Sequence, residues 1–215
     1  MLGLPEVTEI HKPLPKVQIY RKFQLTNIQQ NKFDNDISRI DIVNEISQRT
    51  IPAIKEGVKV KSIYVLAVSL KTQEYDEKNI ERIAKLIPQN LVFALCYESK
   101  IQVAVFCEKL FASEWVNEED AAIDLKGLNF DEVWENIIKK IEGGEWDKNL
   151  TLEENIGIKE RKEKLQKEIN RLETLARKEV QPKRKFELVS QKRKLEEELK
   201  KLSAVFDFDD AKSWF

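Results

Sequence analysis

The chain has 215 residues, of which 41% are hydrophobic, so it is long and apolar enough to bury the core of one ordinary domain with an appendage. Its 37 Lys and Arg residues are balanced by 38 Asp and Glu residues, and the formal net charge of -1 excludes a polycation that binds nucleic acid with its whole surface. No stretch approaches the roughly 20 apolar residues of a membrane span, and no apolar leader follows Met1, so we expect a cytoplasmic protein without membrane attachment.

The charges are unevenly distributed along the chain. Residues 158–202 contain 16 Lys or Arg and 9 Asp or Glu, a net charge of +7, whereas residues 1–157 contain 20 and 26, a net charge of -6. The last thirteen residues contain one Lys and three Asp. We therefore expect an acidic body over residues 1–150, a basic helical hairpin over residues 151–202 and an acidic, aromatic tail over residues 203–215.

The first elements of the body follow from prolines and hydrophobic spacing. Three prolines within the first fifteen residues hold the backbone extended or turned. Residues 17–25 and 27–34 have apolar side chains at helical spacing. Residues 37–47 alternate apolar and polar, which predicts a half-buried strand with three isoleucines on one face, Ile40, Ile42 and Ile46.

The rest of the body is expected to alternate strands and helices. After a turn at Gly57, residues 59–71 form a strand, and residues 75–89 form a helix that Pro88 stops. Residues 90–99 and 100–109 form an antiparallel hairpin at the sheet centre, and residues 110–115 add an edge strand.

A last helix of the body is expected over residues 129–144. Asn129 caps its start, and a glycine pair ends it. Together these elements predict an α+β fold, in which helices pack on a mostly antiparallel sheet of four or five strands.

Residues 151–202 have the heptad spacing of an antiparallel coiled coil. The apolar positions of the first arm are Ile158, Leu165, Ile169, Leu172 and Ala176. Those of the second arm are Leu188, Leu195, Leu199 and Leu202. Pro182 lacks a backbone donor and disfavours α conformation at Gln181, so the helix breaks there and an αα-hairpin is expected.

The reversal of this hairpin gathers five cations, which we call the basic tip: Arg177, Lys178, Lys183, Arg184 and Lys185. The simpler interpretation is a solvated turn, because a helix dipole favours cations at the end of the first arm. The functional interpretation is a contact with a phosphate backbone or an acidic protein surface. Both interpretations stay open at the level of sequence.

Sequence motifs for catalysis are weak. The chain has one His, no Cys pair at metal-ligand spacing and no Gly-rich phosphate loop, so we expect no metal and no cofactor. The alternative is a metal-dependent nuclease subunit that uses four residues in two neighbouring strands, Asp36, Asp41, Glu45 and Lys71. Ser69 stands where such a site would need a second acid, and serine supplies no anionic oxygen to Mg²⁺.

The tail interleaves aromatic residues with aspartates. Four aromatic residues are candidates for docking a partner, Phe206, Phe208, Trp214 and Phe215. Aromatic anchors beside carboxylates suit an apolar pocket with a basic rim, and the alternative is that the tail folds back on its own domain.

Several stretches resemble a bacterial family of domains of unknown function, number 4391. The resemblance spans nearly the entire chain and rests on LGLPEVTEIHKPLPKVQIYRKF, DNDISRIDIVNEIS, YDEKNIERIAKLIPQN, LKGLNFDEVWENII and QPKRKFEL. Genes of this family commonly lie beside those of helicases and DNA methyltransferases in restriction or phage-defence islands. The resemblance implies a non-enzymatic accessory role beside such a helicase or methyltransferase, and it implies no catalytic residues.

From the resemblance and the basic tip together we expect a monomer or dimer that contacts DNA without sequence preference. A purely structural dimer, in which the hairpins of two chains pair, is a third interpretation.

Overall fold

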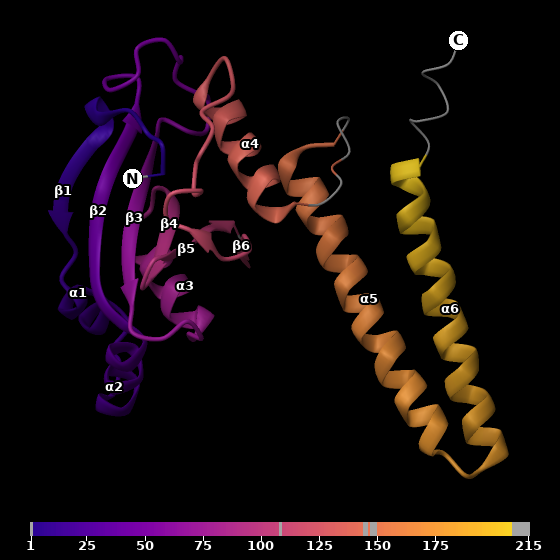
Figure 1. Ribbon diagram of the computed structural model, residues 1–215. Helices are drawn as coiled ribbons and strands as arrows, with labels where there is room; N and C mark the ends of the chain where they lie inside the picture. The colour runs from indigo at the N-terminus through magenta and orange to yellow at the C-terminus, as the bar shows by residue number, and fades with distance from the viewer. Residues whose placement is uncertain (1, 108, 144–145, 147–149, 208–215) are drawn as a thin grey trace, which may run out of the picture. The chain divides into compact units, whose positions relative to one another are not determined.

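The computed structural model describes residues 2–107, 109–143, 146 and 150–207. The chain divides into two compact units, residues 1–143 and residues 144–215. Figure 1 shows that the sheet belongs to the first unit and that two long helices make up most of the second. In the described residues no helix is long and apolar enough to cross a membrane.

The first unit is built on a seven-stranded sheet. Its strands are β1 (Glu9–Pro13), β2 (Ile37–Ser47), β3 (Ser62–Leu70), β4 (Asn90–Tyr97), β5 (Lys100–Cys107), β6 (Lys109–Ala112) and β7 (Val116–Asn117). The order across the sheet is β1-β2-β3-β4-β5-β6, and β7 pairs with β5. All pairings are antiparallel except that of β3 with β4. The α+β class and the β4–β5 hairpin are confirmed, but the expected four or five strands are too few.

Strand β1 was missed because nothing in its sequence alternates. Most of its side chains are exposed, and Pro13 is tolerated because an edge strand needs no backbone donor on its outer side. The strand forms because Lys12 and Pro13 pair with β2, after the short 3-10 helix η1 (Glu6–Thr8). In addition, the buried Asn44 side chain donates a hydrogen bond of 2.8 Å to the Thr8 hydroxyl, which fixes the start of the chain on β2.

The parallel pairing of β3 with β4 follows from the helix between them. Helix α3 (Glu77–Leu86) crosses over from the end of β3 to the start of β4, and such a crossover makes consecutive strands parallel. The Asp76 side chain caps this helix by accepting from the Lys78 N–H. The helix ends at Leu86, before the predicted stop at Pro88, because the residue ahead of a proline disfavours α conformation.

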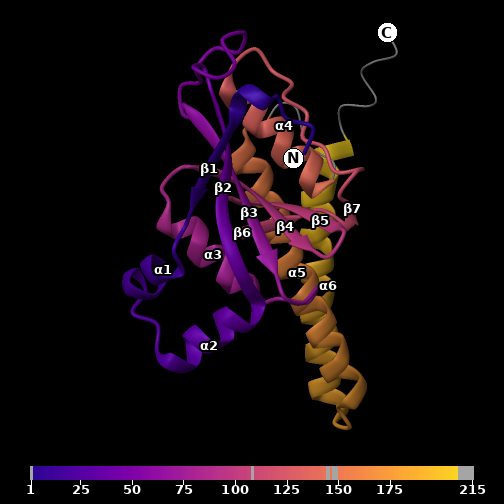
Figure 2. The ribbon, with the colours of Figure 1, turned by 60° about the vertical axis from the view of Figure 1, so that its left-hand side comes forward.

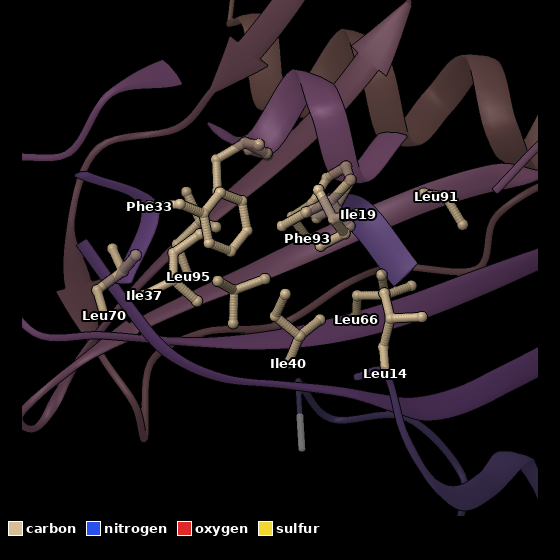
Figure 3. Close-up of a cluster of buried hydrophobic side chains, with 14 residues drawn as sticks. Leu14, Ile19, Phe33, Ile37, Ile40, Leu66, Leu70, Leu91, Phe93 and Leu95 are labelled. Carbon is tan, nitrogen blue, oxygen red and sulfur yellow. The ribbon is translucent and has the colours of Figure 1, made fainter. Parts of the chain in front are cut away.

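Three helices cover one face of the sheet: α1 (Lys16–Lys22), α2 (Asn27–Asp36) and α3. Figure 3 shows the apolar side chains between these helices and the strands. The cluster consists of Leu14, Ile19, Phe33, Ile37, Ile40, Leu66, Val68, Leu70, Ile80, Ile83, Leu91, Phe93, Leu95 and Ala104. Leu66 and Val68 belong to this cluster, whereas the equally buried Ile63 and Val65 alternate with them along β3 and point to the other face.

Helix α4 (Phe130–Glu142) packs on that other face and contacts β3, β5 and β6. Figure 2 shows α3 and α4 on opposite sides of the sheet. The predicted cap is confirmed, since the Asn129 side chain accepts from the Glu132 N–H at 3.0 Å. Gly143 ends the helix with a positive φ of 68°, a conformation that suits glycine.

An irregularity in β2 between Ile42 and Asn44 changes which side chains share a face. Ile42 pairs with Leu66 on the face covered by α1–α3, but Ile46 pairs with Ile63 on the face covered by α4. The expected common face of Ile40, Ile42 and Ile46 is therefore wrong, because an extra residue in a strand reverses the side-chain alternation beyond it.

One carboxylate in α4 holds the loop that leads into β3. Asp131 accepts hydrogen bonds from the backbone N–H groups of Val58 at 2.6 Å, Lys59 at 3.1 Å and Val60 at 2.7 Å. Gly57 makes this approach possible, because a Cβ there would lie 2.3 Å from the Asp131 carboxylate oxygen. Although desolvation raises the pKa of Asp131, the hydrogen bonds from Val60, Val58 and Lys59 outweigh it and hold the pKa below its usual value.

The second unit contains α5 (Leu152–Lys178) and α6 (Pro182–Asp207), which we call the helix pair. The two helices contact each other and run in opposite directions (Figure 1). Thr151 and Glu154 form a capping box at the start of α5. Four predicted apolar positions of α5 are buried, Leu165, Ile169, Leu172 and Ala176. Ile158 and the four predicted leucines of α6 are half-buried.

Replacing Asp131 should destabilise the first unit. Asp131→Asn removes the charge and one acceptor oxygen from a carboxylate with three backbone donors, and we expect a loss of about 1–3 kcal/mol in the free energy of unfolding at pH 7. Because the folded pKa of Asp131 is lowered, its stabilisation is present above the unfolded pKa near 3.8 and is lost as the pH falls through the folded pKa. The difference between wild type and variant should therefore shrink below about pH 4.

Urea titration followed by circular dichroism at pH 7 and pH 3.5 would measure this difference. Glu135→Gln is the control in the same helix, because the Glu135 carboxylate contacts Lys139 at 3.4 Å on the surface and its loss should cost less than about 1 kcal/mol. A deficit of Asp131→Asn that stayed constant between the two pH values would contradict the assigned role of the charge.

Candidate functional site

The structure places the basic tip at the turn between α5 and α6. Arg177 and Lys178 lie in the last turn of α5, and Lys183, Arg184 and Lys185 lie in the first turn of α6. Only residues 179–181 separate the two helices, and Pro182 is the first residue of α6. All five cations are exposed. These bounds bring the five predicted residues to the turn between the two helices. Figure 1 shows that turn at one end of the helix pair.

Two ion pairs join the helices along their length. Arg161 of α5 contacts Glu198 of α6 at 2.6 Å, and Glu173 of α5 contacts Lys192 of α6 at 3.2 Å. Glu173 also contacts Arg177 at 2.5 Å. Hydrogen bonds from Lys192 and Arg177 lower the pKa of Glu173, so this carboxylate stays charged and connects the end of α5 to α6.

The other four cations of the basic tip have no ion-pair partner in the described part of the chain: Lys178, Lys183, Arg184 and Lys185. Three of them occupy the first turn of α6, which contains no acidic residue. The partial positive charge at a helix start repels cations and attracts anions. Helices α3, α4 and α5 each have a Glu or Asp in the first turn, whereas α1 and α2, like α6, have none. The three cations at the start of α6 therefore add to the positive end of the helix dipole, and an anion bound there would reduce this repulsion.

Exposed apolar side chains lie beside these cations, and none of them is among the candidate residues predicted from the sequence. Phe186 is 75% exposed, Val180 is 89% exposed and Leu175 is 43% exposed. A groove of about 390 Å³ at the same end is lined by two cations and two acids, together with Leu175, Leu188 and Gln191. The cations are Lys178 and Arg184, and the acids are Glu179 and Glu187. The signal was available in the sequence, since Phe186 falls outside the heptad positions of the second arm.

The structure does not bring the four nuclease candidates to one face of the sheet. Asp41 pairs with Ala67 of β3, whereas Glu45 pairs with Tyr64, and residues 64 and 67 point to opposite faces. Asp41 contacts Arg39 at 2.8 Å, and Glu45 contacts Arg49 at 2.9 Å. The alternation expected for residues 37–47 would put residues 41 and 45 on one face, but the irregularity in β2 between Ile42 and Asn44 reverses it between them.

Asp36 and Lys71 do come together, but through the backbone. The Lys71 N–H donates to the Asp36 carbonyl oxygen at 2.8 Å. The Asp36 carboxylate accepts from the Asp76 N–H at 3.0 Å and from the Asn79 side chain at 2.7 Å. This carboxylate therefore joins the end of α2 to the start of α3.

The expectation of no metal and no cofactor concerns clusters of metal ligands and reactive thiols. Within the described residues no group of three or more His, Cys, Asp and Glu side chains could hold a metal ion. Burial raises the pKa of the Cys96 thiol to about 11, with a smaller contribution from the charge of Glu118. Cys96 is therefore protonated near neutral pH and is not a ready nucleophile.

The tail lies mostly beyond the part of the chain that the structure describes. Phe206 belongs to the last turn of α6. Phe208, Trp214 and Phe215 lie outside the described residues. The docking role of this tail stays a prediction.

Comparison with known proteins gives one match. The family model described as "Domain of unknown function (DUF4391)" matches residues 2–199. No curated protein and no solved structure matches the chain.

Two carboxylates of the nuclease alternative should differ in their effect on stability. Asp36→Ala leaves the Asp76 N–H and the Asn79 amide without their acceptor, and we expect a loss of about 1–3 kcal/mol in the free energy of unfolding. Asp41→Ala removes only a partner of the exposed Arg39 side chain, so a loss below about 1 kcal/mol is expected.

Thermal and urea unfolding of both variants would measure these losses, and incubation of labelled DNA with Mg²⁺ or Mn²⁺ would test the enzymatic alternative. If wild type cleaved DNA and both variants lost cleavage while keeping wild-type stability, the structural role of Asp36 would be wrong.

Proposed function

The chain belongs to the DUF4391 family, and we propose that it is a non-enzymatic accessory protein that contacts nucleic acid phosphates through its basic tip. It would serve a bacterial DNA-processing or phage-defence system in the cytoplasm. The body would dock on a helicase or DNA methyltransferase subunit, as the resemblance described above implies.

A single observation carries the phosphate contact: the first turn of α6 gathers three cations without a partner in the described part of the chain. Cations at a helix start lower the stability of the helix, so an unbound tip is less stable than an ordinary turn would be. A phosphate backbone removes this repulsion, because its charges neutralise the cations and the helix start together.

The arrangement of the cations supports positioning rather than sequence reading. The cations surround a turn of three residues, and phosphate contacts orient a protein without reporting base identity. The proposed binding is therefore weak, independent of sequence and strongly dependent on salt.

We also propose that α5 and α6 form an antiparallel coiled-coil hairpin. The burial of Leu165, Ile169 and Leu172 and the ion pair between Glu173 and Lys192 support it. Such a hairpin would present the basic tip away from its own base, where α5 begins. The aromatic tail would then contribute a separate docking segment for the partner through Phe206, Phe208, Trp214 and Phe215.

Charge reversal at the tip should abolish binding to nucleic acid. We expect wild type to bind labelled single-stranded and double-stranded DNA, with a slope of about -3 to -4 in a plot of log binding constant against log salt, because each phosphate contact contributes about -0.7 to -0.9. The triple variant Lys183→Glu, Arg184→Glu, Lys185→Glu should bind at least about 10-fold more weakly at low salt, since three contacts become repulsions.

The measurement is fluorescence anisotropy at two salt concentrations. The matched control is Lys167→Glu, Lys200→Glu, Lys201→Glu, which changes the net charge equally at exposed positions away from the turn. An equal loss in both triple variants, or binding that does not respond to salt, would argue against a contact at the tip.

A further inference from the structure

We infer that the basic tip binds single-stranded nucleic acid, with Phe186 as the surface on which a base stacks. The inference rests on the proposed phosphate contact and names the class of nucleic acid that this site takes. It starts from an aromatic ring that is 75% exposed in the second turn of α6.

Two cations share the helix face of Phe186, although Val189 and Ser190 also lie three and four positions from it. Residues three and seven positions apart share a helix face, so Phe186 lies on the same face as Lys183 and Arg193. Both cations are exposed, and in the described part of the chain neither forms an ion pair. At 1.5 Å per residue, Lys183 lies about 4.5 Å and Arg193 about 10.5 Å along the axis from Phe186. An aromatic surface thus stands between two cations on one exposed face.

This face is separate from the contact between the helices. The groove at the tip includes Leu188 and Gln191 of α6, and Leu188 is one of the predicted heptad positions. Phe186 does not line that groove and does not pack in the seam. Its exposure therefore does not arise from an incomplete contact with α5.

Cations alternating with an exposed aromatic ring suit a single strand better than a duplex. Flexible single strands expose base faces that stack on aromatic side chains, while their phosphates contact nearby cations. In a duplex the base faces are covered by stacking on each other, so the ring of Phe186 has no base face on which to stack. Lys183 and Arg193 can contact phosphates of both forms, but Phe186 can contribute only to the single strand. Phe186 is therefore the residue that would make the tip prefer single-stranded to double-stranded nucleic acid.

The test compares wild type with Phe186→Ala by fluorescence anisotropy at low salt. The probes are a labelled oligothymidylate and a hairpin duplex with the same number of phosphates. Stacking of one base corresponds to about a 5- to 150-fold change in affinity, so Phe186→Ala should weaken binding to the single strand by this factor. Its affinity for the duplex should change less than about twofold, because the cations remain.

Two further variants control for packing and for ring chemistry. Val180→Ala removes another exposed apolar side chain beside the tip and should leave both affinities unchanged. Phe186→Trp keeps a stacking surface and should retain binding to the single strand. Circular dichroism should show equal helix content in all variants, because each position is exposed.

Three results would overturn the inference. Unchanged single-strand binding in Phe186→Ala, together with loss in the Lys183, Arg184, Lys185 triple variant, would leave the phosphate contact intact and exclude stacking. Equal weakening for strand and duplex would also exclude stacking. If wild type bound labelled poly-glutamate but neither nucleic acid, the tip would be a docking surface for an acidic protein, and both the inference and the proposed function would be wrong.

Discussion

The parallel pairing of β3 with β4 imposes the constraint on which the first unit depends. Parallel strands connected by a helix are buried on both faces, and β3 is accordingly apolar on both, with Ile63 and Val65 opposite to Leu66 and Val68. Helices α1–α3 cover one face and α4 covers the other, although α4 comes late in the sequence. The hydrogen bonds of Asp131 connect the start of α4 to the loop before β3, so the helix that closes the second face also fixes the entry to the central strand.

The sequence predicted elements whose determinants are local. The β4–β5 hairpin, the Asn129 cap and the glycine end of α4 depend on a few neighbouring residues, and each is found where the spacing indicated. Strand β1 escaped prediction because it is held by pairing with β2 and by the Thr8–Asn44 hydrogen bond, both of which are contacts at long range. The side chains of β2 beyond Asn44 were assigned to the wrong face of the sheet. An extra residue within the strand reverses the alternation, and the residues before it give no sign of this reversal.

In the candidate site, too, the features set by neighbouring residues could be predicted, and those set by long-range contacts could not. The five cations of the tip could be found from sequence because Pro182 and the heptads place the turn among them. Within the described residues, Arg177 has an ion-pair partner and the other four cations have none. This difference could not be predicted, because it depends on which cations Glu173 contacts, and these are Arg177 and Lys192. The exposure of Phe186 likewise required knowing which α6 positions face α5.

The approach of Gly57 to Asp131 has an evolutionary consequence. A side chain at position 57 would occupy the space of the carboxylate, and the carboxylate in turn satisfies three backbone donors of the following residues. Neither residue can therefore be exchanged alone without leaving a clash or unsatisfied donors. Among other members of the family, the two positions should covary: glycine should accompany an acidic residue at position 131, and a larger residue at position 57 should accompany its loss together with a differently shaped loop.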